Sequence, residues 1–202
     1  VDHVRMKKML VVLDYGGGNL KSVVNLLESL DVPFVLTDKA EKIEQADKLL
    51  FPGQGHFGQV MGSLNQKGLT APLKAVIEKG VPFFGICVGL QVLFDSSEEA
   101  PNVKGLGIFK GSCIRFQTGK VPQIGWNKIQ TTAANTFLSD DFYYFVNSYH
   151  VVPADSSVVS AVADYHVPFT AAIQHKNVTA TQFHPEKSGQ VGRDTLKRWV
   201  FS

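Results

Sequence analysis

Short apolar runs alternate with amphipathic stretches through the first ninety residues of the chain. Buried strands are predicted where apolar residues run together, at 9–13, 33–36, 48–51 and 81–84. Helices are predicted between them, at 20–30, 41–46, 57–64 and 71–79, and Gly80 marks the end of the last one. Strands that alternate with helices favour a parallel α/β sheet, in which functional sites gather beyond the carboxyl ends of the strands.

The pattern changes after residues 96–102, where short apolar runs follow one another without helices between them. The stretch from Leu106 to Phe116 splits into two runs around Lys110-Gly111, which predicts a hairpin. Further strands are predicted at 126–130, 142–146, 158–163, 169–174 and 178–182, and a terminal helix at 190–201. We expect this half to close the sheet with antiparallel strands.

Length and composition fit one domain. The chain has 202 residues, of which 44% are hydrophobic, enough to build a sizeable core. It shows no repeat and no linker, so we expect a single domain over 1–202, with residues 1–5 as a non-native or disordered extension. The charges sum to +2 without a basic stripe, so neither nucleic acid nor a membrane surface is an expected partner.

The cysteines indicate the cellular compartment in which the protein is expected to work. The two cysteines, Cys87 and Cys113, lack the spacing of metal ligands. We see no secretory leader, and no apolar stretch reaches the roughly twenty residues needed to span a bilayer. We therefore expect a cytoplasmic protein with free thiols and no bound metal.

One cysteine stands in a distinctive turn. The apolar run 81–84 leads into Gly85-Ile86-Cys87-Val88-Gly89, and Leu-Gln-Val-Leu-Phe follows. This reads as a buried strand, a sharp turn and a helix, the geometry of the nucleophile elbow, in which glycines permit a strained turn. A lone cysteine is usually a buried apolar filler. At the first turn of a helix, however, the dipole and the backbone N–H groups favour a thiolate.

A partner base for Cys87 lies almost a hundred residues further on, in Phe183-His184-Pro185-Glu186. A histidine that takes the thiol proton, itself oriented by a carboxylate, is the general arrangement of nucleophile, base and orienting group. Pro185 favours an extended conformation at His184, and residues two apart in an extended segment point the same way. The pattern predicts that Glu186 lies beside the imidazole. We expect the other five histidines to be ordinary surface or core residues.

Two glycine-containing loops follow predicted strands. Gly16-Gly17-Gly18 lacks the spacing of a dinucleotide or Walker loop, so we favour a backbone that closely approaches a partner or substrate. Pro52-Gly53-Gln54-Gly55 follows the strand 48–51, which is expected beside the Cys87 strand. Glycines let a peptide turn, so that a backbone N–H faces a developing oxyanion.

These motifs together resemble a known family. Gly-x-Cys-x-Gly-x-Gln with a distant His-Pro-Glu is similar to the class I (triad) glutamine amidotransferases. Within them the chain most resembles the glutaminase subunits of imidazole glycerol phosphate synthase, over about residues 14–189. The motifs that carry this closer resemblance are 14–19, 52–55, 85–91, 122–127, 143–149 and 184–188. The resemblance implies a flavodoxin-like three-layer fold with a central, mostly parallel sheet.

The resemblance also implies an activity and a partner. Cys87, His184 and Glu186 would hydrolyse glutamine to glutamate and ammonia through a cysteinyl thioester, without a cofactor. The ammonia would pass to a (β/α)₈ cyclase subunit, in a heterodimer that serves histidine biosynthesis.

Further residues acquire roles by the same resemblance. Those that would form the oxyanion hole and bind glutamine are Gly53, Gln54, Gly55, Val88, Gln91, Ser148 and Tyr149. Those that would face the synthase are Asn19, Trp126, Tyr144 and Lys187.

Two other functions stay open at this point. The nearer one is a glutaminase for another synthase, such as those that form anthranilate or pyridoxal phosphate. The further one is a non-catalytic flavodoxin-like binding module, in which Cys87 is structural.

Overall fold

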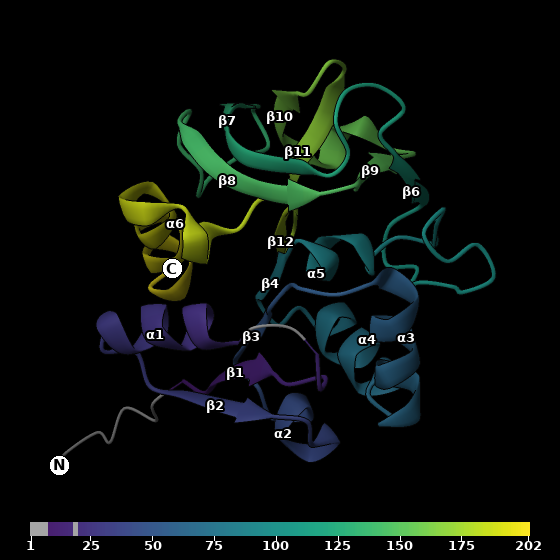
Figure 1. Ribbon diagram of the computed structural model, residues 1–202. Coiled ribbons are helices and arrows are strands. Elements are labelled where there is room, and N and C mark those ends of the chain that lie inside the picture. Colours follow the sequence, from purple (N-terminus) through teal and green to yellow (C-terminus); the bar gives the residue numbers. More distant parts are fainter. Residues whose placement is uncertain (1–7, 18–19) are drawn as a thin grey trace, which may run out of the picture.

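The computed structural model describes residues 8–17 and 20–202, and its first half is a parallel sheet covered by helices (Figure 1). The five parallel strands, in spatial order, are β2 (Phe34–Thr37), β1 (Leu10–Leu13), β3 (Lys48–Phe51), β4 (Phe83–Ile86) and β12 (Val178–Thr181). The longer helices are α1 (Lys21–Ser29), α3 (Phe57–Gln66), α4 (Thr70–Glu78) and α6 (Gly189–Val200), and α2 (Ala40–Glu44) is short. The elements predicted before residue 87 are all confirmed, within a few residues at their ends.

β1 and β4 are apolar throughout and buried, because both faces of the sheet are covered there. Successive side chains point to opposite faces, so Leu10 and Val12 pack with residues of α1 and α6, including Trp199. Val11 and Leu13 pack instead with α2, α3 and α4. The result is three layers, with α1 and α6 on one side of the sheet and α2 to α4 on the other (Figure 1).

A buried lysine ties the last helix to the sheet. Lys48 Nζ donates hydrogen bonds to the carbonyls of Trp199 (2.7 Å), Val200 (2.9 Å) and Ser202 (2.9 Å). Its charge therefore lies at the negative end of α6, a favourable position. Burial lowers the pKa of Lys48, and the charge of Lys8 lowers it further.

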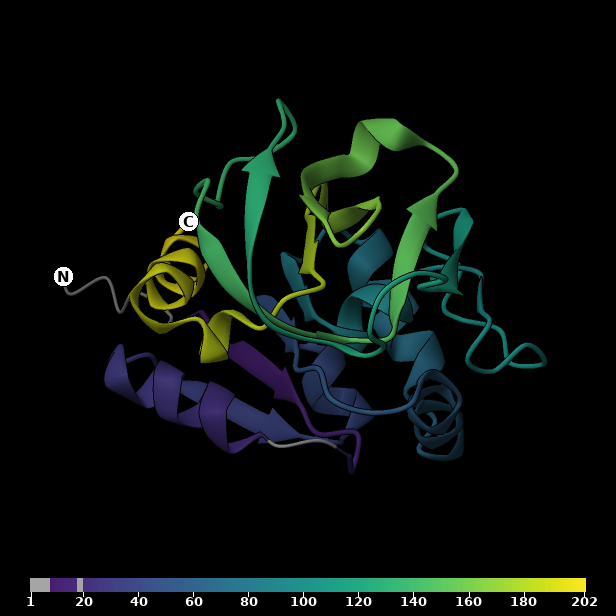
Figure 2. The same ribbon diagram turned by 45° about the horizontal axis from the view of Figure 1, so that its top comes forward.

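The second half continues the same sheet with antiparallel strands, as predicted. Beyond β12 the order is β11 (Pro168–His175), β10 (Val159–Asp164), β7 (Gln123–Thr131) and β8 (Phe142–Asn147), which makes nine strands among the described residues. This part rises above the parallel strands in Figure 1 and leans over them in Figure 2. Its own aromatic core includes Phe116, Tyr143, Phe145 and Phe169.

The hairpin predicted over 106–116 is wrong, and two strands were missed. Only β6 (Gly111–Arg115) forms, and it pairs with β5 (Ser96–Ser97) and β9 (Tyr149–Pro153) in a small separate sheet. Residues 106–109 do not pair with β6. They donate instead to the backbone carbonyls of Val92, Leu93 and Phe94. The first apolar run, 106–109, is therefore hydrogen-bonded to the segment that follows Cys87 and not to β6.

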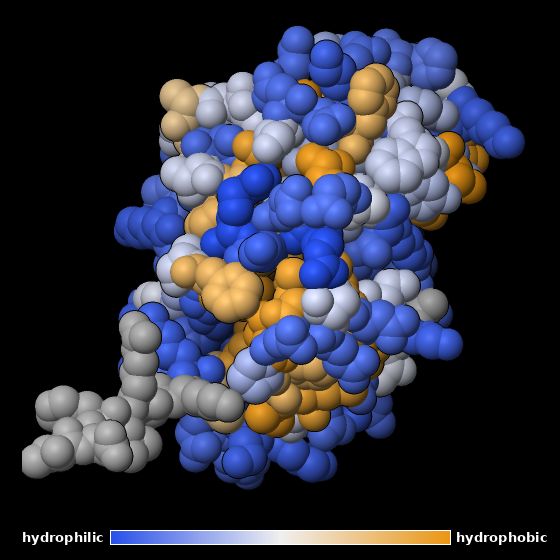
Figure 3. Space-filling view, turned by 90° about the vertical axis from the view of Figure 1, so that its left-hand side faces the viewer, coloured by the Kyte–Doolittle hydropathy of each residue, from blue (hydrophilic) through white to orange (hydrophobic). Residues whose placement is uncertain are grey.

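In the part of the chain that the structure describes, none of the helices is long and apolar enough to cross a bilayer. On the side where α1 and α6 lie, apolar patches alternate with hydrophilic side chains (Figure 3).

Candidate active site

Cys87 occupies a strained elbow between β4 and α5 (Val88–Gln91). Its φ of 51° and ψ of −103° are rare for a residue with a side chain. A Cβ on Gly85 would lie 2.5 Å from the carbonyl oxygen of Gly89, and one on Gly89 would lie 2.7 Å from that of Phe51. Both flanking glycines are thus required for the turn to pack against the sheet. The Cys87 N–H donates to the carbonyl of Thr181 (2.7 Å), which holds the elbow beside β12.

The helix after the elbow is shorter than predicted. It has four residues and ends at Gln91, whereas the pattern suggested that it continues through Phe94. The carbonyls of 92–94 are taken by the loop 106–109, so they do not accept within a longer helix. The Val88 N–H, at the first helical position, lies too early in the chain to find an acceptor inside the helix. It is therefore suited to face an anion formed at Cys87.

His184 and Glu186 form a buried pair. His184 Nδ1 and Glu186 Oε1 are 2.7 Å apart, and their side chains are 1% and 4% exposed. His184 is extended, as Pro185 predicted, but residues 185–187 form one 3₁₀ turn rather than an extended segment. The predicted pairing is confirmed, although the turn, not strand-like alternation, produces it.

The charges around His184 favour its protonated form. Burial opposes that form, but the charge of Cys87, a hydrogen bond with it, and then Glu186 outweigh burial and raise the pKa of His184 to about 10. Glu186 Oε2 is buried and makes no hydrogen bond among the described residues. The negative charge of the carboxylate is therefore balanced by the imidazole of His184. The site therefore suits a thiolate–imidazolium pair.

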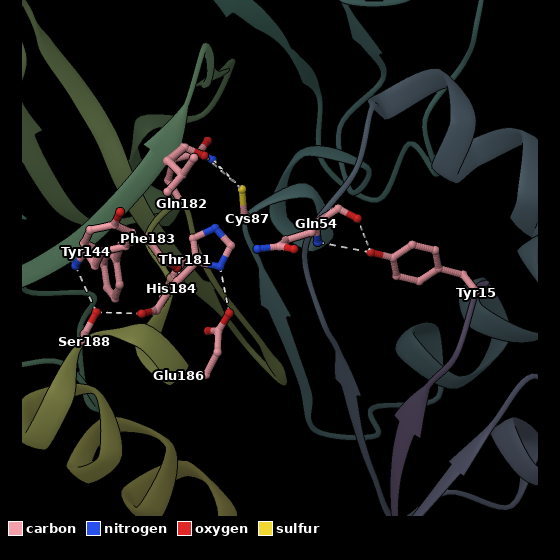
Figure 4. Close-up of polar contacts among 11 residues, drawn as sticks. Tyr15, Gln54, Cys87, Tyr144, Thr181, Gln182, Phe183, His184, Glu186 and Ser188 are labelled. Carbon is pink, nitrogen blue, oxygen red and sulfur yellow. Dashed lines mark hydrogen bonds and ion pairs between the residues drawn. The ribbon is translucent and has the colours of Figure 1, made fainter. Parts of the chain in front are cut away.

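A glutamine that the sequence reasoning passed over also contacts the sulfur. Gln182 Nε2 lies 3.5 Å from Cys87 Sγ, and the Gln182 side chain is fully buried (Figure 4). Its position two residues before His184 was the available signal, because β12 ends there at the same sheet edge as β4. Its oxygen accepts from Gln91, one of the predicted substrate residues.

The other predicted substrate residues lie close by. Gln91 Nε2 donates to the carbonyl of Tyr149 (3.2 Å), and the carbonyl of Val146 lies 3.9 Å from Cys87 Sγ. Ser148 stands between β8 and β9, so this strand junction borders the elbow. The structure thus brings Gln91 against the carbonyl of Tyr149, and the β8–β9 junction that contains Ser148 directly follows the strand that reaches the sulfur.

The Gly53–Gly55 segment also packs against the elbow. A Cβ on Gly53 would lie 1.6 Å from the carbonyl oxygen of Ile86, so only glycine fits there. The Gln54 peptide groups face the Tyr15 hydroxyl, which donates to Gln54 O (2.6 Å) and accepts from Gln54 N (3.2 Å). Tyr15 lies on the side of Gln54 away from Cys87 (Figure 4). Its hydroxyl stays neutral: burial raises the pKa of Tyr15 to about 12.

Three of the four predicted interface residues lie near His184 and Glu186. Trp126 and Tyr144 are paired across β7 and β8 with ring centroids 6.0 Å apart, and Trp126 is 55% exposed. Tyr144 O accepts from His184 N (2.9 Å), and Lys187 follows Glu186 in the 3₁₀ turn. Asn19 lies outside the described residues.

The second cysteine lies apart from this chemistry. Cys113 is fully buried, and its Sγ lies 3.6 Å from the carbonyl of Gln91. Burial and then the charge of Glu99 raise the pKa of Cys113 to about 12, so it remains a neutral thiol. Within the described ranges, no group of three or more His, Cys, Asp or Glu side chains is placed to hold a metal ion.

The geometry of elbow, imidazole and carboxylate agrees with the comparison to known sequences. The profile of the class-I glutamine amidotransferases matches residues 11–201. The chain belongs to the class-I glutamine amidotransferase family. Two relatives are each an imidazole glycerol phosphate synthase subunit HisH. The one from Geobacillus kaustophilus is 44% identical over 202 residues and covers 95% of this chain and 96% of its own. The one from Thermus thermophilus is 44% identical over 190 residues, covering 94% and 93%.

Solved structures of glutamine amidotransferases share the fold. One crystal structure of a glutamine amidotransferase matches with a TM-score of 0.76 at 19% identity and covers 95% of this chain and 96% of its own. PurLQS from Thermotoga maritima gives 0.74 at 19% identity, with 97% and 99% covered. The predicted class I glutamine amidotransferase fold, with antiparallel strands in the C-terminal half, is therefore confirmed.

Proposed function

We propose that this chain is the glutaminase subunit of imidazole glycerol phosphate synthase, with Cys87, His184 and Glu186 as its catalytic triad. The observation that supports this most directly is the convergence of a strained cysteine elbow with a buried His–Glu pair almost a hundred residues away in the chain. The HisH relatives point to the same synthase.

In the proposed reaction the Cys87 thiolate attacks the side-chain carbonyl carbon of glutamine. The carbonyl oxygen becomes an oxyanion, which the Val88 N–H stabilises. Protonated His184 gives its proton to the departing nitrogen, so ammonia leaves and a γ-glutamyl thioester forms. His184 then takes a proton from water, the water oxygen attacks the thioester, and glutamate leaves as the sulfur recovers its electron pair. Glu186 holds the imidazole throughout.

Substrate glutamine would lie against the β8–β9 junction. Ser148 and Tyr149 would hold it from this junction, and Gln91 from α5, since Gln91 contacts the carbonyl of Tyr149 and the carbonyl of Val146, just before the junction, lies 3.9 Å from the sulfur. The Gly53–Gly55 segment would add a second oxyanion donor once its peptide turns from Tyr15 towards Cys87. A cavity of about 190 Å³ beside Tyr15 and Gln54 gives that peptide room to move.

A synthase subunit of (β/α)₈ fold would dock next to the triad. The exposed face of β7 and β8 carries Ile124, Trp126 and Phe142, which are 61%, 55% and 51% exposed, a concentration of apolar side chains typical of a protein interface. Asn19, Tyr144 and Lys187 are the further contacts proposed for the partner. A protected route makes chemical sense, because free ammonia would be protonated in water and lose its nucleophilicity.

We further propose that the full chain 1–202 acts as one glutamine amidotransferase domain in the cytoplasm, where Cys87 stays reduced. The partner is proposed to control the activity by releasing the Gln54 peptide, so the chain alone should hydrolyse glutamine slowly.

The test is a glutamate-release assay on the wild-type chain with and without the synthase subunit and its nucleotide ligand. The liganded partner should raise kcat rather than only lower KM. Cys87→Ala should lose activity by about 10⁴-fold or more, whereas Cys113→Ala, the matched control, should stay within about two-fold. Retained turnover in Cys87→Ala would reject the triad, and full activity of the lone chain would reject control by the partner.

A further inference from the structure

Gln182 is the buried polar side chain at the sulfur to which the triad gives no role. Its Nε2 lies 3.5 Å from Cys87 Sγ, within hydrogen-bond distance for sulfur, and none of the side chain is exposed. It approaches from the end of β12, on the same sheet edge as the elbow (Figure 4). A buried amide in this position is therefore part of the environment in which the sulfur changes its charge.

The surrounding network determines which end of the amide faces the sulfur. The carbonyl of Tyr149 can only accept, so Gln91 must present its NH₂ group there (3.2 Å). The same Gln91 nitrogen lies 3.2 Å from Gln182 Oε1, so Gln182 must present its oxygen to Gln91. Its NH₂ group is then the end directed at Cys87. One backbone carbonyl thus fixes the orientation of two glutamines.

We propose that Gln182 is a further catalytic residue, which donates an N–H hydrogen bond to the Cys87 thiolate. The inference rests on the proposed function in that Cys87 is the nucleophile. Cys87 is only 9% exposed, so protein donors must replace most of the water that would otherwise solvate an anion there. The neighbouring carbonyl of Val146, 3.9 Å from Sγ, favours the S–H form instead, and the Gln182 donor opposes it.

The hydrogen bond would act twice in each turnover. Before attack it raises the fraction of sulfur present as thiolate. In the thioester the sulfur carries no charge and the bond weakens. When water breaks the thioester, negative charge returns to the sulfur and the bond strengthens again, which makes Cys87 a better leaving group.

The test follows the rate of iodoacetamide alkylation of Cys87 against pH in the full-length chain, with the labelled peptide identified by mass. Gln182→Met keeps the length of the side chain and removes the donor, so the pH midpoint of alkylation should rise by about one unit, the effect of losing one hydrogen bond to a charged group. Gln182→Glu places an acceptor at the sulfur and should raise the midpoint further. At a pH below the midpoint, kcat/KM for glutamine should fall about ten-fold in Gln182→Met.

The matched control is Gln174→Met. The Gln174 amide makes two hydrogen bonds to Thr136, remote from Cys87, so this substitution should change thermal stability without moving the midpoint. If Gln182→Met does not melt cooperatively, the near-isosteric Gln182→Glu decides. A midpoint that stays unchanged or falls in the folded variant overturns the proposal. Because alkylation needs no glutamine, this outcome is separate from failure of the glutaminase proposal, which would appear as a wild-type chain that is alkylated but turns over no glutamine with its partner.

Discussion

The two cysteines of this chain lie at opposite ends of the same one-turn helix and meet opposite chemistry. Cys87 directly precedes α5, beside the Val88 N–H, and faces Gln182 and His184. Cys113 comes from β6 and contacts the carbonyl of Gln91, the last residue of that helix. Both sulfurs face a backbone carbonyl, but Cys87 also meets the Gln182 donor and the His184 cation, whereas Cys113 meets the Ser97 hydroxyl and the opposing charge of Glu99.

The comparison shows that burial alone does not distinguish a reactive thiol from an inert one. Cys87 is only 9% exposed and Cys113 is not exposed at all. What differs is the sign of the groups that face each sulfur. Burial raises the pKa of Cys113 to about 12 because no donor is strong enough to compensate an anion there. At Cys87 the elbow delivers the sulfur to backbone and side-chain donors.

The largest expected difference is in chemical reactivity. At pH 8 a pKa of about 12 leaves roughly one Cys113 thiol in 10⁴ ionised, and this thiol is also inaccessible. Iodoacetamide should therefore label Cys87 much faster than Cys113, as measured by peptide mass spectrometry in the native protein. Labelling in denaturant should make the two rates similar. Equal rates in the native state would contradict the contrast.

The next contrast is between two carboxylates: Glu186, which bonds to His184 beside Cys87, and Glu99, whose charge acts on Cys113. Glu186→Gln removes the charge that supports protonated His184, so the pKa of His184 should fall and glutaminase activity should drop about 10²- to 10⁴-fold. The alkaline limb of the rate–pH profile should also move to lower pH, because the imidazolium loses its proton sooner.

Glu99→Gln is the control for this carboxylate. It acts on the Cys113 end of the helix and should leave turnover within about two-fold. Similar losses from both substitutions would mean that the two ends of α5 are not chemically distinct.

The neutral thiol should appear in the pH dependence of stability. The pKa of Cys113 is raised from 9.0 to about 12 in the folded chain, so its contribution to stability is complete below pH 9 and is lost as the pH rises towards 12. The unfolding free energy of the wild type, relative to that of Cys113→Ala, should therefore decline by about 2 kcal/mol between pH 8 and pH 10.5.

Urea unfolding of the two proteins at both pH values measures this. Titrations elsewhere, such as that of Tyr15, cancel in the difference. A difference that grows with pH would show that Cys113 is not held neutral.

The smallest expected effect concerns the backbone N–H of Gln54, which donates to Tyr15 and not towards Cys87. Tyr15→Phe removes both hydrogen bonds to the Gln54 backbone, so the peptide should turn more easily towards the oxyanion. Partner-free glutamine hydrolysis should rise about two- to ten-fold, the equivalent of one neutral hydrogen bond, while the partner-stimulated rate stays unchanged. Tyr143→Phe, which removes a buried hydroxyl bonded to Thr195, is the control. A slower partner-free rate in Tyr15→Phe would show that the tyrosine supports the active conformation.

The parts of the site that the sequence predicted are those with a local signature. Two glycines around Cys87 are needed for an elbow wherever it occurs, and the structure shows both of them in contact too close for a Cβ. The proline between His184 and Glu186 keeps the pair within one turn. The apolar runs of the parallel half were readable because both faces of that sheet are buried.

The parts that the sequence missed depend on partners distant in the chain. Residues 106–109 have the apolar pattern of a strand, but their N–H groups donate to the backbone carbonyls of residues 92–94. These carbonyls are then not available to continue α5, which ends early. β9 forms because β6 offers it an edge. Tyr15 lies inside the 14–19 motif and Gln182 stands two residues before His184, but the contact each one makes depends on a group across the sheet edge.

The sequence by itself predicted the fold class and the three residues proposed as the triad, because period, glycine sterics and proline geometry act over a few neighbouring residues. Only the tertiary structure decided that Cys87 meets Gln182 and His184 while Cys113 meets the charge of Glu99, and that the Gln54 peptide groups face Tyr15. Those outcomes depend on the direction of hydrogen-bonding groups brought together from separate strands, and direction is not encoded in the spacing of residue types.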